Sequence, residues 1–316
     1  MNAPASSPVM VRVRKLQRSF GEVRAVQDVS FEVASGEIFG LVGPDGAGKT
    51  TTMRMLAGVL RPDMGELEVD GVDVRADAEG AKLRLSYMPQ RFGLYEDLTV
   101  AENIRFHAEL FGVPRRLRLQ RAGELLQAAG LRGFESRLAG RLSGGMKQKL
   151  GLICALMHTP RVLLLDEPTT GVDPVSRRDF WAILYRLRET GVAIVMATAY
   201  MDEAERCSRL ALLHGGQLRY CDTPQRLKAI MPGALLALSA PALEQLRVVR
   251  ERAGALPGVL GTLLMGDRVH VRVDEAARRE PQLRAALADI DGLRIEPTTP
   301  GIEDVFVALL ESEDGT

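Results

Sequence analysis

The residues with the clearest chemistry form a glycine-rich segment directly after a short apolar run. The apolar run is Ile38–Val42, and the segment after it has the spacing G-x-x-x-x-G-K-T. Glycines let the backbone curl so that its N–H groups and the start of the next helix surround phosphate oxygens. The lysine of such a loop reaches the β- and γ-phosphates of a nucleotide, and the threonine hydroxyl can bind Mg²⁺. The candidate nucleotide-binding residues are Gly43, Pro44, Asp45, Gly46, Ala47, Gly48, Lys49, Thr50 and Thr51.

A chance glycine-rich turn before a helix would match the same spacing. The placement of the segment favours phosphate binding, because a buried strand before the loop and a helix after it give the pattern its mechanism. We therefore expect the chain to bind a nucleotide here.

A second candidate site is the pair Asp166 and Glu167, at the end of the apolar run Val162–Leu165. Two carboxylates at the end of a buried strand are costly unless they serve a cation or a proton transfer. Asp166 suits the binding of Mg²⁺, directly or through water, and Glu167 suits the polarisation of an attacking water. The alternative, an ordinary acidic pair that begins a turn, does not explain why both patterns share one chain.

The composition excludes several classes of protein. With 316 residues the chain is longer than one ordinary domain. Its 41 Lys and Arg balance 41 Asp and Glu, which argues against a nucleic-acid-binding role. We find no stretch of the roughly 18 uncharged apolar residues that a membrane helix needs. Cys154, Cys207 and Cys221 lack metal or disulfide spacing, which indicates reduced cytosolic thiols. Residues 1–8 are expected to be disordered and lack the pattern of a secretory signal.

The elements that must position these residues follow from the apolar periodicity. Strand-like and helix-like runs alternate around both candidate sites, which predicts an α/β core with a mainly parallel sheet. Between the sites the period becomes helical, which predicts a small helical lobe. Two sets of apolar residues carry that period: Leu98, Ala101, Ile104, Ala108 and Phe111, then Leu119, Ala122, Leu125, Leu126 and Ala129.

After Pro232 the pattern changes to the order β-α-β-β-α-β, which is that of a ferredoxin-like split unit. A last helix is expected over Ile302–Leu310. The six elements of the split unit are expected over Leu235–Ser239, Ala242–Ala253, Thr262–Met265, Val269–Val273, Pro281–Ala288 and Leu293–Glu296.

Four more features occur in order with the two candidate sites: Phe20, Gln90, the run Ser143-Gly144-Gly145, and Asp173 within Gly171–Pro174. Taken singly, each has an ordinary explanation, such as a core aromatic, a turn glutamine or a helix cap. Taken together, they make the chain resemble the ATP-binding subunit of an ABC transporter over roughly residues 9–230.

This resemblance implies a fold and a set of ligands. The fold is an α/β P-loop ATPase of the ABC type, with a mixed sheet core, a β-rich subdomain and a helical lobe over about residues 91–150. Residues 233–316 would form a small α+β accessory domain. The implied ligands are ATP and Mg²⁺, with Thr50, Gln90 and Asp166 near the metal and with Glu167 and Gln90 as catalytic residues.

The resemblance also implies how two ATPase domains meet. Phe20 would stack on the adenine. Ser143, Gly144 and Gly145 would bind the γ-phosphate held by the opposite subunit, and Asp173 would lie in the loop that crosses the interface. The pair would be a homodimer or a heterodimer on the cytoplasmic face of the inner membrane, driving polytopic permease subunits.

One position departs from the family pattern. Ala199 stands where the family has a histidine that contacts the γ-phosphate. Loss of one such contact typically lowers a rate by about 10²–10³. Two hypotheses therefore stay open: a working ATPase motor, and a slow or non-hydrolysing ATP clamp that forms the degenerate half of a heterodimer.

The partners and the cargo are less constrained by the residues. Met201–Arg206 and Ile302–Phe306 resemble the drug-export branch of the family, including daunorubicin-type exporters. A soluble ABC protein acting on ribosomes or DNA is disfavoured, because the chain has one motif set and no net charge. We expect no nucleic-acid partner. The C-terminal segment would stabilise or regulate a dimer, or would simply cover a sheet edge.

Overall fold

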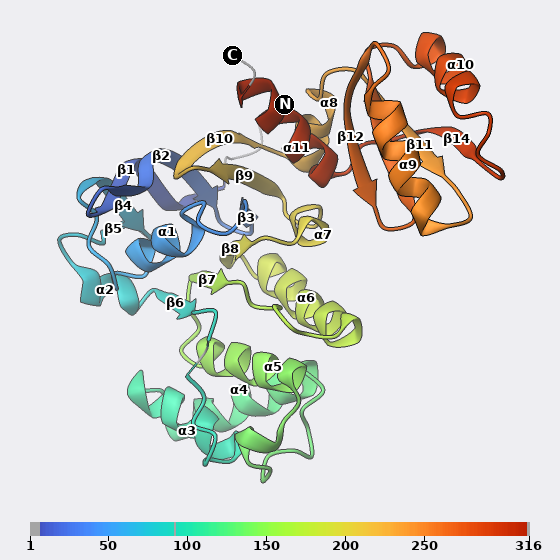
Figure 1. The fold of residues 1–316 in the computed structure, drawn as a ribbon. Helices are drawn as coiled ribbons and strands as arrows, with labels where there is room; N and C mark the ends of the chain where they lie inside the picture. Colours follow the sequence, from blue (N-terminus) through green and yellow to red (C-terminus); the bar gives the residue numbers. More distant parts are fainter. Residues whose placement is uncertain (1–6, 92, 315–316) are drawn as a thin grey trace, which may run out of the picture. The chain divides into compact units, whose positions relative to one another are not determined.

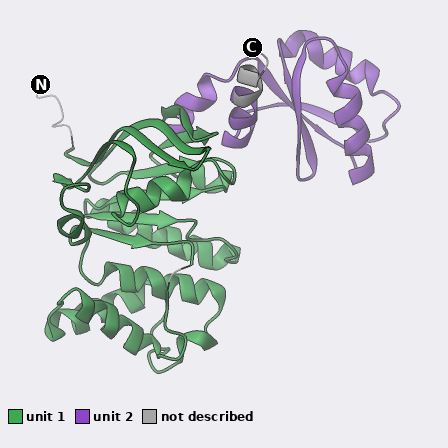
Figure 2. Ribbon diagram, turned by 60° about the vertical axis from the view of Figure 1, so that its left-hand side comes forward, with its two compact units in different colours: residues 1–222 green, residues 223–316 purple. Residues whose placement is uncertain are grey.

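The computed structural model describes residues 7–91 and 93–314, and it divides into two compact units, residues 1–222 and 223–316 (Figure 2). Most of the N-terminal segment expected to be disordered, residues 1–6, lies outside the described residues. Helix α8 (Pro224–Ala229) belongs to the second unit, although the ATPase-like part was expected to extend to residue 230.

The first unit begins with an antiparallel sheet in the order β2-β1-β4-β5. Along β1 the buried Val11 and Val13 alternate with Arg12, whose guanidinium pairs with Glu32 and Glu68 on the neighbouring strands. This alternation is expected of a sheet with one face on the core and one in water. The strands are β1 (Val9–Phe20), β2 (Val23–Ala34), β4 (Met64–Val69) and β5 (Val72–Asp73).

A second, six-stranded sheet carries the chemistry, in the order β10-β9-β3-β8-β7-β6 (Figure 1). All its neighbours pair in parallel except β9 and β10. Every residue of β3, β7 and β8 is buried, because both faces of the sheet are covered. The strands are β3 (Ile38–Val42), β6 (Leu85–Met88), β7 (Val162–Asp166), β8 (Ala193–Thr198), β9 (Arg209–His214) and β10 (Gln217–Asp222).

Two hydrophobic cores lie on the two faces of this sheet. Met53 of α1 packs with Phe39 and the antiparallel sheet in one core, and Trp181 of α6 packs with Ile38 and the helical lobe in the other. The predicted α/β class with a mainly parallel sheet is therefore confirmed. The helices of the unit are α1 (Lys49–Leu56), α2 (Ala78–Lys82), α3 (Val100–Leu110), α4 (Arg115–Ala128), α5 (Gly144–Leu156), α6 (Pro174–Glu189) and α7 (Met201–Ala204).

Helices α3, α4 and α5 form the lobe, and Thr99 begins α3 with a capping box to Glu102. Ile104 and Ala108 are buried as their spacing predicts. Both runs are helical as predicted, although Ala101 of the first run is exposed and Leu119 of the second is 61% exposed. Leu117 of α4 is exposed too, whereas Leu126 is buried, so the apolar spacing alone does not define the covered face.

The second unit has the element order β-α-β-β-α-β within it, and its sheet order is β12-β13-β11-β14. All three strand pairs are antiparallel, as in a split β-α-β unit. The helix expected from Pro281 begins earlier, at Ala276, so the proline lies inside the helix and not in its first turn. Its other elements are β11 (Ala234–Ser239), α9 (Leu243–Gly254), β12 (Val259–Met265), β13 (Arg268–Val273), α10 (Ala276–Ala286), β14 (Arg294–Thr298) and α11 (Ile302–Asp314).

Among residues 7–91 and 93–314, no helix has both the length and the apolar character required to cross a membrane.

Candidate nucleotide site

The candidate residues meet at the carboxyl edge of the six-stranded sheet. In the parallel register Val42 lies beside Thr198, and Asp166 lies beside Ala197. The segments that leave β3, β7 and β8 therefore start side by side, which is where open α/β sheets bind ligands. The glycine-rich segment follows β3 and Glu167 follows β7.

Two glycines show why the phosphate loop has its spacing. Gly48 has a φ of 97°, and a Cβ atom there would lie 2.4 Å from the carbonyl oxygen of Ala25. A Cβ atom on Gly43 would lie 2.2 Å from the carbonyl oxygen of Leu213. A side chain at either position would displace the backbone of a neighbouring strand or loop, so the curled loop requires both glycines.

Lys49 is the first residue of α1, and its side chain is only 4% exposed. Its Nζ donates to the carbonyl oxygens of Gly43 at 2.8 Å and Pro44 at 3.0 Å. The same nitrogen lies 3.8 Å from Oε1 of Glu167. The ammonium group is thus held inside the curl of the loop, where a phosphate group would meet it together with the N-terminus of α1.

Asp166 is buried, and it is hydrogen-bonded by two hydroxyl groups. Thr50 Oγ1 donates to Oδ1 at 3.0 Å, and the Tyr87 hydroxyl donates to Oδ2 at 3.2 Å. Burial raises the pKa of Asp166 in spite of these donors. It also raises the pKa of Tyr87, so that hydroxyl keeps its proton and can donate. A carboxylate in this position would be stabilised by a nearby cation.

The residues here fit Mg²⁺ as part of a nucleotide complex. Thr50 and Asp166 offer hydroxyl and carboxylate oxygens, the ligands that Mg²⁺ prefers. Within the described ranges, no group of three or more His, Cys, Asp and Glu side chains could hold a metal ion by itself. Mg²⁺ bound through one or two side chains needs further oxygens, which nucleotide phosphates supply.

Glu167 has an unusual backbone, with a φ of 49°. A non-glycine residue in this region is strained and persists only where its surroundings hold it. Its N–H donates to the carbonyl oxygen of Ala197 at 2.9 Å, and Gln90 Nε2 donates to its Oε2 at 3.0 Å. The structure therefore brings Gln90 and Lys49 to the Glu167 carboxylate, which can polarise a water molecule or accept a proton from it.

Ser143 and Asp173 each accept hydrogen bonds from the first turn of the helix that they begin. Ser143 is the N-cap of α5 and accepts from the N–H of Met146 at 3.3 Å. Asp173 is the N-cap of α6, and the N–H of Ser176 is the main group that holds the pKa of Asp173 below its ordinary value. A Cβ atom on Gly145 would lie 2.5 Å from Ser176, so the two helix starts are in close contact. Ser143 and Asp173 are exposed, as an interface with a second subunit requires.

Phe20 ends β1 and is 48% exposed, so it is not a core residue. The guanidinium of Arg18 lies over its ring, 4.8 Å from the centroid. An exposed ring of this kind can stack on a flat base.

Ala199 is exposed and follows β8 directly. Its methyl group offers no hydrogen bond donor. Four residues further, Glu203 is fully buried and accepts hydrogen bonds from Thr169, Trp181 and Thr198. Sequence analysis missed this carboxylate and the hydroxyl of Tyr87, because an acidic residue in a short helix usually faces water.

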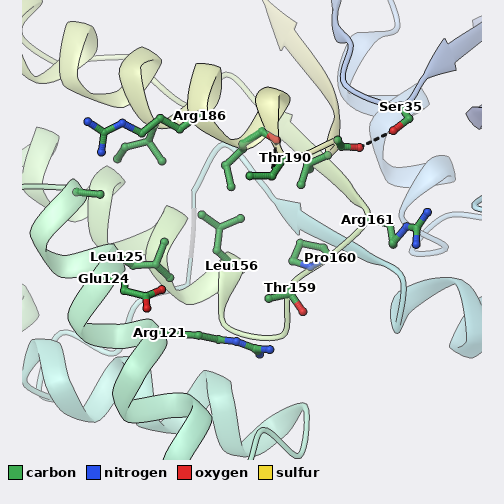
Figure 3. Close-up of a pocket in the computed structure, with 15 residues that line it drawn as sticks. Ser35, Arg121, Glu124, Leu125, Leu156, Thr159, Pro160, Arg161, Arg186 and Thr190 are labelled. Atoms are coloured by element: carbon green, nitrogen blue, oxygen red, sulfur yellow. Dashed lines mark hydrogen bonds between the residues drawn. The ribbon is translucent and has the colours of Figure 1, made fainter. Parts of the chain in front are cut away.

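A hollow of about 750 Å³ lies away from all of these residues, between α4 and the C-terminal half of α6 (Figure 3). Leu125, Leu156 and Leu187 line it, with Arg161 and Arg186 among its charged residues. The two arginines extend in different directions (Figure 3). The hollow contains none of the candidate residues.

Comparison with known proteins gives a consistent result. The family model described as ABC transporter matches residues 26–170. The chain is 44% identical over 289 residues to the probable multidrug ABC transporter ATP-binding protein YbhF of Escherichia coli strain K12, which covers 90% of this chain and 49% of that protein. The chain thus spans about half the length of that relative.

Two further relatives match over nearly their whole length. The chain is 30% identical over 308 residues to the linearmycin resistance ATP-binding protein LnrL of Bacillus subtilis strain 168, covering 95% of this chain and 98% of that one. It is 35% identical over 304 residues to the Nod factor export ATP-binding protein I of Rhizobium etli, covering 94% and 92%.

Solved structures show the same fold. An ATP-binding subunit of an ABC transporter superposes with a TM-score of 0.65 at 28% identity, over 70% of this chain and 92% of that chain. A dimeric bacterial ABC transporter cassette superposes with a TM-score of 0.63 at 24% identity, over 68% and 98%.

Proposed function

The chain belongs to the ABC transporter ATP-binding proteins, a family of ATPases, and we propose that it hydrolyses ATP to drive export through separate membrane subunits. One observation carries the hydrolytic part of this proposal. Glu167, held in a strained backbone conformation, faces both Lys49 and Gln90 at the end of the phosphate loop. A carboxylate in that position can polarise the water that attacks the γ-phosphate.

Each candidate residue has its own role in binding ATP or in hydrolysing it. The loop of residues 43–48 and the N-terminus of α1 bind the phosphates, and Lys49 places a positive charge beside the β- and γ-oxygens. Phe20 stacks on the adenine. Glu167 orients and polarises the attacking water, with Gln90 holding its carboxylate in place. Thr50 and Asp166 would hold Mg²⁺, with Gln90 near it, and the ion when bound neutralises developing charge on the phosphate oxygens.

A second ATPase domain completes the site in this proposal. The start of α5, with Ser143, Gly144 and Gly145, would present N–H groups to the γ-phosphate of a partner subunit, and Asp173 at the start of α6 would lie in the loop that crosses the interface. The fold neighbour described as a dimeric cassette supports such a pair. The pair would be a homodimer or a heterodimer, and its closure on ATP would move the membrane subunits.

The cargo and the location follow from the relatives. Their names refer to multidrug transport, linearmycin resistance and Nod factor export. We propose that this chain works on the cytoplasmic face of the inner membrane with polytopic permease subunits that export a drug-like or lipophilic compound. The chain should co-purify with such a subunit from native membranes. Its recovery without any polytopic protein would contradict this arrangement.

The test of the hydrolytic proposal is steady-state ATPase activity of the chain beside Glu167→Gln, with Mg²⁺ and with ATP binding measured in both. We expect the substitution to lower turnover by about 10²–10³ while ATP still binds. Equal turnover in the two proteins would show that Glu167 is not the group that polarises water.

A second candidate function is a slow ATP clamp, and Ala199 is the observation that favours it. The residue is exposed, so an imidazole can be placed there without repacking the core. If the missing contact limits turnover, Ala199→His should raise it roughly tenfold or more. Binding of ATP by the natural chain without turnover, with activity gained in Ala199→His, would establish the clamp.

The role of the second unit is also proposed. We propose that residues 223–316 stabilise or regulate the ATP-bound pair. A chain that ends at Asp222 should then dimerise more weakly in ATP than the full chain. Unchanged dimerisation would leave a stabilising cover for a sheet edge as the explanation.

A further inference from the structure

A fully buried carboxylate lies next to the candidate site without touching the phosphate loop. Glu203 is in the short helix α7 and is 0% exposed. Its Oε1 accepts from the Thr169 hydroxyl and from the Trp181 indole N–H at 3.3 Å. Its Oε2 accepts from the Thr198 hydroxyl at 2.6 Å. Both carboxylate oxygens therefore accept hydrogen bonds from side chains.

The three donors come from three separate segments of the candidate site. Thr169 is two residues beyond Glu167, Thr198 ends β8 just before Ala199, and Trp181 lies in α6, which Asp173 caps. Glu203 therefore connects three parts of the candidate site. They are the turn after Glu167, the end of β8 next to Ala199, and helix α6, whose first turn follows Asp173. A buried carboxylate held only by neutral donors is stable only while all of them stay in place.

Glu203 is linked to Glu167 through the short turn that follows Glu167. Thr169 is 1% exposed, and only Pro168 separates it from Glu167. The N–H of Thr170 donates to the carbonyl oxygen of Glu167 at 3.3 Å. Because Glu167 has a strained positive φ, its conformation depends on such anchors on both sides. On the C-terminal side the bond from Thr169 to Glu203 is one anchor, beside the bonds from the N–H and the hydroxyl of Thr170 to Glu167.

The link to residue 199 runs through one hydroxyl group. Thr198 Oγ1 donates to Glu203 and accepts from the N–H of Tyr200 at 3.0 Å. The two bonds fix the backbone on either side of Ala199. The same carboxylate thus bonds a residue near Glu167 and a residue next to Ala199.

We propose that Glu203 is a positioning residue for ATP hydrolysis, acting through Thr169 on the orientation of Glu167. This inference rests on the proposed function, because it assumes that Glu167 polarises the attacking water. It assigns to Glu203 no contact with ATP, so the substitution should act on turnover and leave the affinity for ATP in place.

The first test is Glu203→Gln, which keeps the size of the side chain but replaces one acceptor oxygen by an NH₂ group. We expect kcat for ATP to fall roughly 10- to 100-fold, because a shift of about 1 Å in a catalytic group has effects of this size. The KM for ATP should stay within about twofold. The matched control is Glu37→Gln, another buried glutamate at the opposite end of β3, which bonds Arg209 and the N–H of Ala34. Its kcat should be that of the natural chain.

A second variant tests the route and protects against misfolding of the first. Thr169→Val removes the hydroxyl donor and nearly preserves the volume. It should lower kcat as Glu203→Gln does, and the double variant should add little, because both substitutions break one connection. A Thr169→Val protein with the natural kcat would overturn the proposed route.

Trp181 supplies a spectroscopic signature, because it is the only tryptophan in the chain. Its indole N–H bonds directly to Glu203, so Glu203→Gln should change the emission of the folded protein, whereas Glu37→Gln should not. Unchanged emission together with unchanged kcat would overturn the inference. A natural chain with no turnover at all would instead refute the proposed hydrolysis, and the positioning role with it.

Discussion

The two edges of the six-stranded sheet differ in what they bring together. At the carboxyl edge the buried Lys49, Asp166 and Glu203 lie among hydroxyl and amide groups that all point toward the ends of β3, β7 and β8. At the amino edge the hollow between α4 and α6 is lined in part by leucines, and its arginines Arg161 and Arg186 extend apart (Figure 3). The comparison teaches that convergence of polar groups, and not the size of a hollow, marks the site in this sheet.

The direction of the helices explains the difference. The N-termini of α1 and α6 lie at the carboxyl edge and favour negative charge there. Their C-termini, and that of α5, lie toward the amino edge and favour positive charge. Arg121 donates to the carbonyl oxygen of Met157 at the end of α5, and Arg186 lies in the last turn of α6. Arg121 and Arg186 thus lie at helix ends, and Arg161 pairs with Asp70, so these arginines do not by themselves indicate a ligand.

The largest effect is expected when the positive charge at the carboxyl edge is removed. Lys49→Ala should lower ATP turnover by at least about 10²–10³, because a buried ammonium beside the phosphates is lost. Lys82→Ala is the control, since Lys82 pairs on the surface with Glu79. Turnover of each protein at saturating ATP measures the effect. Comparable rates in the two variants would remove Lys49 from the mechanism.

The features that could be predicted from the sequence are those that depend on residues close together in the chain. The phosphate loop, the buried strands β3 and β7 and the α/β class follow from spacing and apolar runs, because a curled glycine loop and a strand buried on both faces each have a short sequence signature. Glu203 has no such signature. Its burial depends on Thr169, Trp181 and Thr198, which only the tertiary fold brings to it. The exposure of Leu119 has the same cause, since packing and not spacing decides which face of α4 is covered.

A smaller effect should appear on the side of the sheet away from the nucleotide. His158 stacks on Phe111, with its ring centroid 3.9 Å away, and its Nε2 bonds the carbonyl oxygen of Leu85 at 3.0 Å. Burial lowers the pKa of His158, and the Arg121 cation acts in the same direction. The unfolded chain then binds a proton more readily, so stability is unaffected well above pH 6.5 and falls as the pH drops below about 6.5.

The measurement is the free energy of unfolding in urea at several pH values between about 5 and 8. The contribution of one such histidine cannot exceed about 1.4 kcal/mol per pH unit. His158→Gln keeps a donor for Leu85 and should flatten the acid side of the curve. Since burial lowers the pKa of His107 too, some slope should remain in the variant. A curve of the natural steepness in His158→Gln would assign the acid sensitivity elsewhere.

The smallest effect on turnover is expected at the hollow itself. Arg121 lines it and donates to the carbonyl oxygen of Met157 at 2.9 Å. Arg121→Ala removes a charged donor from a helix end, so the free energy of unfolding should fall by about 1 kcal/mol. ATP turnover should remain within about twofold of the natural rate, because the bond serves α5 and reaches no candidate residue. A tenfold loss of turnover in a fully folded Arg121→Ala protein would show that the amino edge takes part in catalysis, and the contrast between the two edges would then fail.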